Sequence, residues 1–307
     1  MTIDIGLIGC GRWGHLILRD LLALGARVHV VAPSEVTRAF AASNGAASAV
    51  ARLEAIAELV AGFVVATPTS THAEVIEKLF VTGRPIFVEK PLTNDVASAR
   101  RIVATAGERV FVMDKWRYHP GIEALAAMAR SGELGSLLAI RSYRLGWNHT
   151  LREVDPVWIL MPHDLSIALE ILGSLPAPRA AWTPVAGRGG CDMIAVLADD
   201  SAGLQITIEV GTSQPLYRRS TLVIGDRGVA QLGDAYDDTI VIMDGRPNGA
   251  SSGPQERPVG NAMPLLEELR AFLNHLIGGP PPRSSATEGL LIVERTSALR
   301  ALAGLQD

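Results

Sequence analysis

Short apolar runs alternate with amphipathic segments through the first third of the chain. The runs are rich in β-branched residues and predict strands over residues 3–8, 28–31, 63–66, 86–88 and 110–113. The segments between them repeat apolar residues at helical spacing and predict helices over residues 12–24, 35–43, 72–82 and 95–106. Strands that alternate with helices in this way predict a parallel sheet covered by helices on both faces.

The pattern changes after about residue 118. Helices are predicted over residues 119–131 and 162–172, the second opening at Pro162, with a strand over residues 137–143 between them. Strands separated by short turns follow at 179–185, 193–198, 203–209, 220–224, 229–231 and 239–242, which indicates a mostly antiparallel sheet. We expect a long loop over residues 244–262 and closing helices over 264–277 and 287–302.

The composition is that of a globular protein. Of 307 residues, 48% are hydrophobic and 20% are charged, and the net charge is −4, so nothing favours nucleic acid or an anionic membrane as a partner. The two cysteines, Cys10 and Cys191, form no disulfide framework and no metal site by spacing. We see no signal-peptide pattern and no apolar run of membrane-spanning length, and we therefore expect a cytoplasmic protein.

A glycine-rich turn follows the first predicted strand. Gly9, Gly11 and Gly14 form GxGxxG at the start of the first helix, where the glycines permit a tight turn, a close approach of pyrophosphate and close helix–sheet packing. This context predicts a dinucleotide site facing the helix N-terminus. Arg12 and Trp13 lie inside the motif, and Trp13 either covers the pyrophosphate or packs against the helix.

The end of the second strand distinguishes NAD from NADP in such sites. The strand lacks the acidic residue at its tip that would bond a ribose hydroxyl, although Glu35 follows in the next turn. Ser34, Thr37 and Arg38 could instead receive a 2′-phosphate. We expect NADP or NAD as the cofactor and favour NADP; the alternative for Arg38 is a solvated helix position.

Three further segments, together with the glycine turn and the Pro-His-Asp-Leu-Ser segment at 162–166, carry a family resemblance. They are Ala-Thr-Pro-Thr-Ser-Thr-His at 66–72, Val-Glu-Lys-Pro-Leu at 88–92 and Trp-Arg-Tyr-His-Pro at 116–120. In this order the chain resembles the glucose–fructose oxidoreductase, inositol dehydrogenase and rhizopine-catabolism family. The resemblance implies an α/β fold: an N-terminal doubly wound Rossmann domain over residues 1–117, then an α+β substrate-binding and oligomerisation domain with a large, mostly antiparallel open sheet over 118–307.

The resemblance also assigns roles in cofactor binding. Thr67, Pro68 and Thr69 look like the turn along the ribose and nicotinamide. His72 occupies the family's histidine position, with a helix-terminal residue bonding the loop as the alternative reading. The expected cofactor-binding set is Gly9, Gly11, Arg12, Trp13, Gly14, Ser34, Arg38, Thr67, Pro68, Thr69, His72, Glu89 and Lys90.

Lys90 is the first expected catalytic residue. The segment Glu89-Lys90-Pro91 resembles a family segment that brings a lysine under the nicotinamide. In the family this segment often has a cis bond before the proline. Hydride transfer from a carbinol carbon needs a group that handles the hydroxyl proton, and a lysine at the carboxyl end of a parallel strand is placed for that. A surface lysine is the alternative.

His163 is the second expected catalytic residue, and it lacks its usual partner. The family places an aspartate four residues before this histidine, where this chain has Ile159. Asp164 is expected to serve the helix N-terminus, and Glu153 or Asp155 could reach the cleft from a loop. Two consequences are open. Either His163 acts with Lys90 alone, or the absence of the aspartate means a different substrate or reduced catalysis. The residues Arg117, Tyr143, Trp147 and Asn148 could line the substrate side.

Together these features predict an NAD(P)-dependent oxidoreductase acting on CH–OH groups. It would transfer a hydride between a nicotinamide and a sugar, sugar nucleotide or related polyol or ketone. Two alternatives stay open: a catalytically impaired cofactor-binding regulator of the same fold, and an imine or ketone reductase. The resemblance further implies a homodimer or homotetramer assembled through the C-terminal sheet. Substrate identity and reaction direction do not follow from the sequence.

Overall fold

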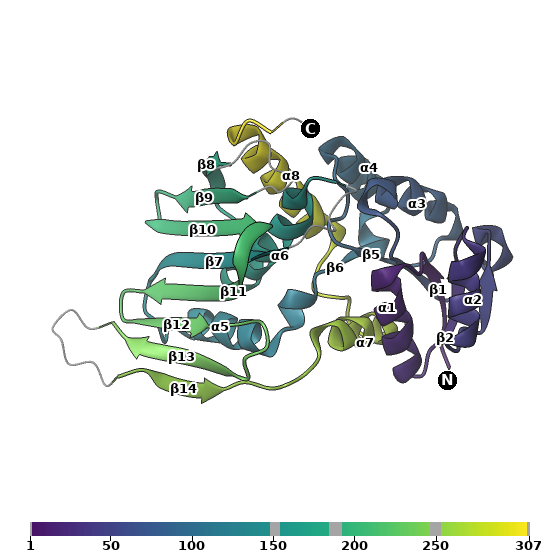
Figure 1. Cartoon of the computed structure of the whole chain (residues 1–307), viewed down its shortest axis with the longest axis horizontal. Coiled ribbons are helices and arrows are strands. Elements are labelled where there is room, and N and C mark those ends of the chain that lie inside the picture. The colour runs from purple at the N-terminus through teal and green to yellow at the C-terminus, as the bar shows by residue number, and fades with distance from the viewer. Residues whose placement is uncertain (1, 148–153, 184–191, 246–252, 306–307) are drawn as a thin grey trace. The chain divides into compact units, whose positions relative to one another are not determined.

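The chain divides into two compact units. The computed structural model describes residues 2–147, 154–183, 192–245 and 253–305 (Figure 1). The first unit comprises Met1–Lys115 and Met263–Val293, and the second comprises Trp116–Ala262 and Glu294–Asp307. The expected boundary after residue 117 stays a prediction, and the return of Met263–Val293 to the first unit is a feature that it did not include.

The first unit is built on a parallel sheet of six strands in the order β3-β2-β1-β4-β5-β6. The strands are β1 (Asp4–Ile8), β2 (Arg27–Val31), β3 (Ser48–Val50), β4 (Gly62–Val65), β5 (Ile86–Glu89) and β6 (Val110–Met113). This confirms the doubly wound parallel sheet. The sequence pattern missed β3, which has only three residues, all half-buried, and therefore no recognisable alternation.

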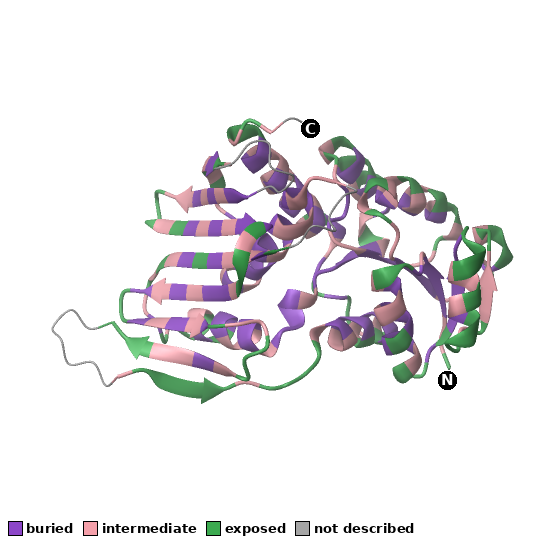
Figure 2. Ribbon diagram, in the orientation of Figure 1, coloured by how far each residue is buried: buried purple, intermediate pink, exposed green. Residues whose placement is uncertain are grey.

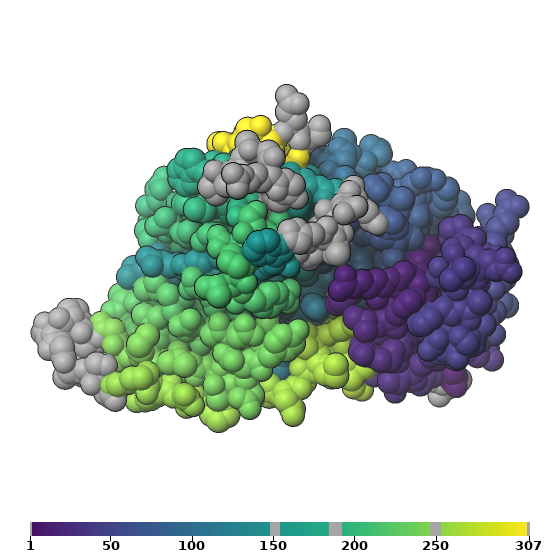
Figure 3. All heavy atoms as spheres, viewed as in Figure 1, coloured from purple at the N-terminus to yellow at the C-terminus, as the bar shows by residue number. Residues whose placement is uncertain are grey.

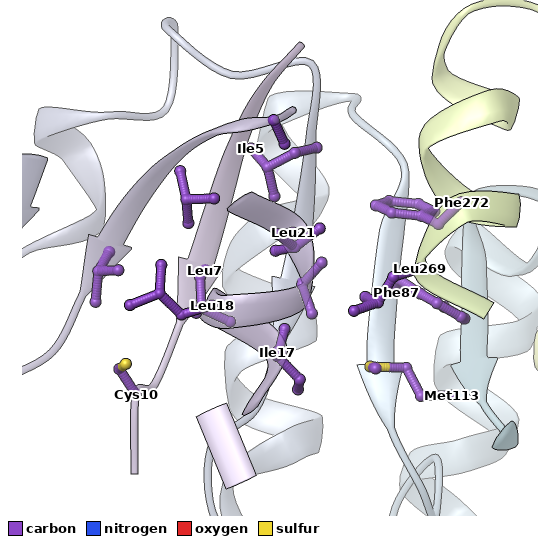
Figure 4. Close-up of a cluster of buried hydrophobic side chains, with 14 of the residues drawn as sticks. Ile5, Leu7, Cys10, Ile17, Leu18, Leu21, Phe87, Met113, Leu269 and Phe272 are labelled. Carbon is purple, nitrogen blue, oxygen red and sulfur yellow. The ribbon is translucent and has the colours of Figure 1, made fainter. Parts of the chain in front are cut away.

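The helices of this unit pack on the sheet. They are α1 (Arg12–Ala23), α2 (Glu35–Ser43), α3 (His72–Leu79), α4 (Val96–Ala106), α7 (Pro264–Leu276) and the first part of α8 (Ala286–Leu302). One core cluster joins α1 and α7 to the strands (Figure 4). Within it the Phe87 ring of β5 stacks on the Phe272 ring of α7, with centroids 5.0 Å apart. This contact holds α7 against β5.

The second unit is built on a mixed sheet of eight strands in the order β14-β13-β12-β11-β7-β10-β9-β8. The strands are β7 (Leu137–Trp147), β8 (Ala177–Trp182), β9 (Met193–Asp199), β10 (Leu204–Gly211), β11 (Ser213–Gly225), β12 (Gly228–Leu232), β13 (Thr239–Asp244) and β14 (Gln255–Pro258). All neighbours pair antiparallel except β7 with β10. This confirms the large, mostly antiparallel sheet.

One face of the second sheet carries helices. They are α5 (Pro120–Ser131) and α6 (Pro156–Leu172), which contact β12, β13, β7 and β10. Burial alternates along the strands, as Figure 2 shows, because successive side chains point to opposite faces. Among the helices of the described ranges, none is both long and apolar enough to cross a membrane.

Helix α6 starts earlier than the sequence predicted. It begins at Pro156, and Pro162 lies inside it rather than at its first turn. The Asp155 carboxylate caps the helix by accepting a hydrogen bond from the Val157 backbone N–H at 2.8 Å. Asp-Pro is itself a helix-start signal, but the second proline drew the prediction six residues downstream. His163 therefore lies within the helix, not at its beginning.

The expected loop over residues 244–262 also contains a strand. β14 pairs antiparallel with β13 and forms the edge of the sheet. All four of its residues are exposed, and its sequence Gln-Glu-Arg-Pro has no apolar alternation that would indicate a strand. Charged residues and a proline are typical of an edge strand, because they discourage pairing with another chain.

Candidate functional site

The glycine turn of the first unit has the shape that a pyrophosphate requires. Gly9 has φ +87°, and a Cβ there would lie 2.7 Å from the Ala66 carbonyl oxygen. A Cβ on Gly14 would lie 2.7 Å from the Gly9 carbonyl oxygen, whereas a Cβ on Gly11 would meet nothing within 4 Å. Two glycines therefore permit close packing and the third leaves open space at the start of α1, so these residues fit a bound dinucleotide.

Trp13 connects the glycine turn to the end of β5. Its indole Nε1 donates a hydrogen bond to the Glu89 carboxylate, and the Lys115 Nζ lies 4.6 Å from the centre of its ring. The indole, which belongs to α1, is thus held against the end of β5, and its expected role toward the pyrophosphate stays a prediction. Arg12, the first residue of α1, is exposed.

The end of β2 holds a guanidinium. Arg38 Nη1 donates to the carbonyl oxygens of Ala32 at 2.9 Å and Pro33 at 2.6 Å. Ser34 caps α2 by accepting from the Thr37 N–H at 3.4 Å. Arg38 is thereby fixed to the loop after β2 instead of extending into solvent, and in the described part of the chain its Nε and Nη2 have no partner.

His72 joins two loops at the carboxyl ends of neighbouring strands. Its Nδ1 lies 2.9 Å from the Pro91 carbonyl oxygen and its Nε2 lies 3.0 Å from the Thr67 carbonyl oxygen. The ring is buried, and burial lowers its pKa. His72 therefore fits the expectation of a residue that bonds the loop. Pro68 is exposed and Thr69 half-buried in the same turn; their contacts with a cofactor remain predictions.

Lys90 stands at the carboxyl end of β5, between the ends of β4 and β6. The strand ends with Glu89, whose carboxylate accepts from the Lys90 backbone N–H at 3.1 Å. The Lys90–Pro91 peptide bond is cis, as the family resemblance implied. Lys90 is half-buried, so it is no ordinary surface lysine.

Three carboxylates and a lysine lie around the end of β5. Glu268 of α7 is buried, and neither carboxylate oxygen has a hydrogen-bond partner among the described residues. Burial raises the pKa of Glu268 well above its ordinary value, and the charges of Glu89 and Asp114 raise it further while Lys115 opposes them. Burial also raises the pKa of Glu89.

Sequence reasoning missed Glu268. The residue lies one helical turn before Phe272 and on the same face, because side chains four apart share a helix face. In β5, Glu89 shares a face with Phe87, because side chains two apart in a strand point to the same face. An acid inside the apolar stripe of Leu265, Leu269 and Phe272 was the signal that could have found it.

The second unit holds a paired carboxylate next to His163. Asp164 accepts from the Ser142 hydroxyl at 2.6 Å and from Arg144 Nε at 2.7 Å, and both members of the ion pair are buried. The expectation that Asp164 serves a helix N-terminus is wrong, because the helix starts eight residues earlier and the carboxylate points to β7.

Trp116 lies among the polar side chains around His163. Its ring is edge-on to the His163 ring with centroids 6.5 Å apart, and it stacks on the His119 ring at 5.1 Å. Arg144 places its guanidinium carbon 4.6 Å from the centre of Trp116. His163, Trp116 and Arg144 therefore form one group, built from α6, the turn before α5, and β7.

The other substrate-side candidates have mostly structural partners. Arg117 is buried and its Nε donates to the Glu170 carboxylate at 2.8 Å. Tyr143 lies on the opposite face of β7 from Arg144, beneath the Arg218 guanidinium at 3.5 Å. Trp147 is exposed.

Of the acids expected to replace the missing aspartate, Asp155 is already engaged. It caps α6 and forms an ion pair with Arg300. Glu153 and Asn148 lie outside the described residues. Ile159 occupies α6 one turn before His163. Lys90 belongs to the first unit and His163 to the second, so their meeting in one site stays a prediction.

Known proteins show the same organisation. Residues 3–113 match the model of an oxidoreductase family with an NAD-binding Rossmann fold. A myo-inositol dehydrogenase of Streptomyces leeuwenhoekii is 28% identical over 93% of this chain and 92% of its own length. An inositol 2-dehydrogenase of Paenarthrobacter aurescens is 36% identical over 45% of this chain and 44% of its own.

A solved structure covers nearly the whole chain. The UDP-N-acetylglucosamine 3-dehydrogenase of Acidithiobacillus ferrooxidans superposes with a TM-score of 0.85 over 99% of this chain and 98% of its own, at 21% identity. At that identity the likeness shows the two-unit fold alone. The family match covers the cofactor unit, and over nearly its whole length the chain is similar to an inositol dehydrogenase, in keeping with its resemblance to the glucose–fructose oxidoreductase, inositol dehydrogenase and rhizopine-catabolism family of oxidoreductases.

Proposed function

We propose that this protein transfers a hydride between a nicotinamide cofactor and a sugar, sugar nucleotide or related polyol. The observation that carries the proposal is Lys90, held half-buried at the carboxyl end of β5 beside a glycine turn that fits a dinucleotide. The family match and the inositol dehydrogenases among its relatives support a carbohydrate-type substrate.

The proposed roles follow from the chemistry of a carbinol. A bound nicotinamide supplies the acceptor for the hydride. Lys90 Nζ holds the proton of the reacting hydroxyl, and the His163 ring in the second unit acts with it as proton donor or acceptor. The cofactor would be bound and oriented by Trp13, Glu89 and His72. The Trp13 indole is fixed on the Glu89 carboxylate, and the His72 imidazole joins the loops that contain Thr67 and Pro91.

The cofactor preference we propose is NADP over NAD. Arg38 is fixed by two carbonyl oxygens at the end of β2, and its Nε and Nη2 have no partner in the described ranges. A guanidinium held there suits a 2′-phosphate. Arg38→Ala should therefore weaken NADPH binding more than NADH binding, and an equal effect on both would oppose the preference.

The second candidate function is a cofactor-binding regulator without catalysis. Ile159 favours it, because this residue stands one helical turn before His163 where the family has a carboxylate, and Asp155 is committed to the helix cap. The half-buried Lys90 beside the glycine turn favours the enzyme instead.

We propose a homodimer or homotetramer assembled through the second sheet. Helices α5 and α6 cover one face only, and side chains of the β-strands, teal to green in Figure 3, form the surface toward the viewer. Light scattering at micromolar concentration should give a dimer or tetramer mass, and a monomer mass would contradict this arrangement.

A substrate panel separates the two candidate functions. The protein is mixed with NAD or NADP and with cyclic polyols, aldoses and nucleotide sugars, and each reaction is followed by nicotinamide absorbance in both directions. We expect reduced cofactor with at least one carbohydrate. Tight cofactor binding without hydride transfer to any member of the panel would reject the enzyme and favour the regulator.

A further inference from the structure

Two arginines face each other across the central strands of the second sheet. Arg144 of β7 and Arg219 of β11 are direct partners in the antiparallel ladder, and they project on the same face because partners in a ladder share a face. Arg144 points to Asp164 of α6, so this is the face that carries the helices. Like charges directly opposite each other destabilise a sheet unless an anion compensates them.

Only the first of the two guanidiniums is paired with a carboxylate among the described residues. Asp164 is engaged through both of its oxygens by Arg144 and by the Ser142 hydroxyl. Arg219 is half-buried, and in the described part of the chain its guanidinium makes no hydrogen bond or ion pair; its close contact is the Tyr217 ring at 4.5 Å. Arg219 therefore has no ion-pair partner of its own in the described ranges, and burial and the charge of Arg144 lower the pKa of its guanidinium although the charge of Asp164 opposes them.

The Arg219 guanidinium lies near the group formed by His163, Trp116 and Arg144. Arg144 lies over Trp116, and the edge of Trp116 meets the His163 ring. Tyr236 is exposed and contributes to the electrostatic surroundings of Arg219, and the neighbouring Ala235 carbonyl accepts from His119 Nε2 at 2.9 Å. Arg219 is thus placed near the proposed proton-transfer residue within one unit, because its strand partner Arg144 lies over Trp116, whose ring meets the His163 ring.

We propose that Arg219 binds an anionic group of the substrate, a carboxylate or a phosphate, and so selects acidic sugar derivatives over neutral ones. This inference rests on the proposed function, because it names the substrate class of the same site. A guanidinium presents paired N–H donors that match the two oxygens of a carboxylate or phosphate. Bound there, the anion would balance the second arginine as Asp164 balances the first.

The test compares two neighbouring arginines of β11. Arg219→Gln removes the proposed anion contact. Arg218→Gln is the matched control, because Arg218 projects to the opposite face and stacks on Tyr143. Binding of glucuronate, glucose 6-phosphate, UDP and glucose to the NADH- or NADPH-loaded protein is measured by calorimetry for the wild type and both variants. Circular dichroism shows whether each variant is folded.

We expect at least one anionic probe to bind the wild type, and Arg219→Gln to weaken it about 10- to 100-fold, the worth of a hydrogen bond to a charged group. Arg218→Gln and glucose should show no such change. The glucuronate and phosphate arms identify which anion the site takes. Failure of every anion to bind the wild type, or equal losses in both variants, would overturn the inference.

The outcome is distinct from that of the substrate panel. Anion binding that depends on Arg219 without any hydride transfer would reject the proposed enzyme and keep the anion site. Hydride transfer to neutral sugars, with no effect of Arg219→Gln on anion binding, would keep the enzyme and reject the anion site.

Discussion

The two units bury carboxylates in opposite ways. In the second unit Asp164 is fully buried and engaged through both oxygens by Arg144 and Ser142. In the first unit Glu268 is equally buried, yet its oxygens have no hydrogen-bond partner in the described ranges, and two other acids face it. A buried charge is stable only when it is paired, so Asp164 is balanced by Arg144, whereas burial without a partner raises the pKa of Glu268 well above its ordinary value.

The paired carboxylate has a structural role, whereas the unpaired one makes stability depend on pH. The buried ion pair of Asp164 and Arg144 holds α6, and with it His163, against β7. The acid of Glu268 stands beside Glu89, which precedes Lys90 and fixes Trp13. We therefore expect the pH sensitivity of this protein to come from the first unit and the rigidity of α6 to come from the second.

Breaking the paired carboxylate should have the largest effect on stability. Asp164→Ala leaves the Arg144 guanidinium buried without its partner, which costs about 3–5 kcal/mol. Urea denaturation of the second unit measures this loss. The double replacement Asp164→Leu with Arg144→Met removes both charges and should be nearly neutral. A single variant that loses less than about 1 kcal/mol would show that the pair is not structural.

Removing the helix cap should have a smaller effect in the same unit. Asp155→Ala loses the acceptor for the Val157 N–H and the partner of Arg300, and a lost cap costs about 0.5–2 kcal/mol. Asp155→Asn keeps a capping oxygen and serves as the control, so the difference between the two variants isolates the cap. An Asn variant as unstable as the Ala variant would assign the loss to the ion pair instead.

Changing the unpaired carboxylate should have the smallest effect and the opposite sign. Glu268 has a folded-state pKa raised above its unfolded value of 4.5, so the folded protein binds more protons and loses stability as pH rises through the folded pKa. Glu268→Gln should therefore match the wild type below about 4.5 and exceed its melting temperature at alkaline pH.

The neighbouring Glu267 provides the control for this experiment. It is partly exposed and paired with Arg270, so Glu267→Gln should change stability little at any pH. A loss of stability in Glu268→Gln at alkaline pH, or a difference from the wild type that does not vary with pH, would contradict the assignment of a buried, protonated acid.

The sequence predicted the parts of the molecule that local patterns determine. Gly9 and Gly14 specify the glycine turn because a Cβ at either position would clash with the backbone, and alternating apolar runs predict the parallel sheet. The cis bond before Pro91 followed from the family resemblance. Each of these features depends on residues that are close together in the chain.

Features that depend on distant residues could not be predicted. The ion pair of Asp164 needs Arg144, twenty positions earlier, and the surroundings of Glu268 need Glu89 at the end of β5 and Asp114 just after β6. The start of α6 was misplaced because Asp155-Pro156 and Pro162 both resemble helix starts, and burial of the whole helix decided between them. Arg219 became informative only when the strand register placed it opposite Arg144.

Hydride transfer by a lysine variant tests the central claim most directly. Lys90→Met is compared with Lys78→Met, an exposed lysine of α3, using the best substrate of the panel and a direct titration of the cofactor. We predict that Lys90→Met binds the cofactor as the wild type does but loses about 10²- to 10⁴-fold in turnover, whereas Lys78→Met is unaffected. Wild-type turnover in Lys90→Met would contradict the assignment of Lys90 as the residue that handles the substrate proton.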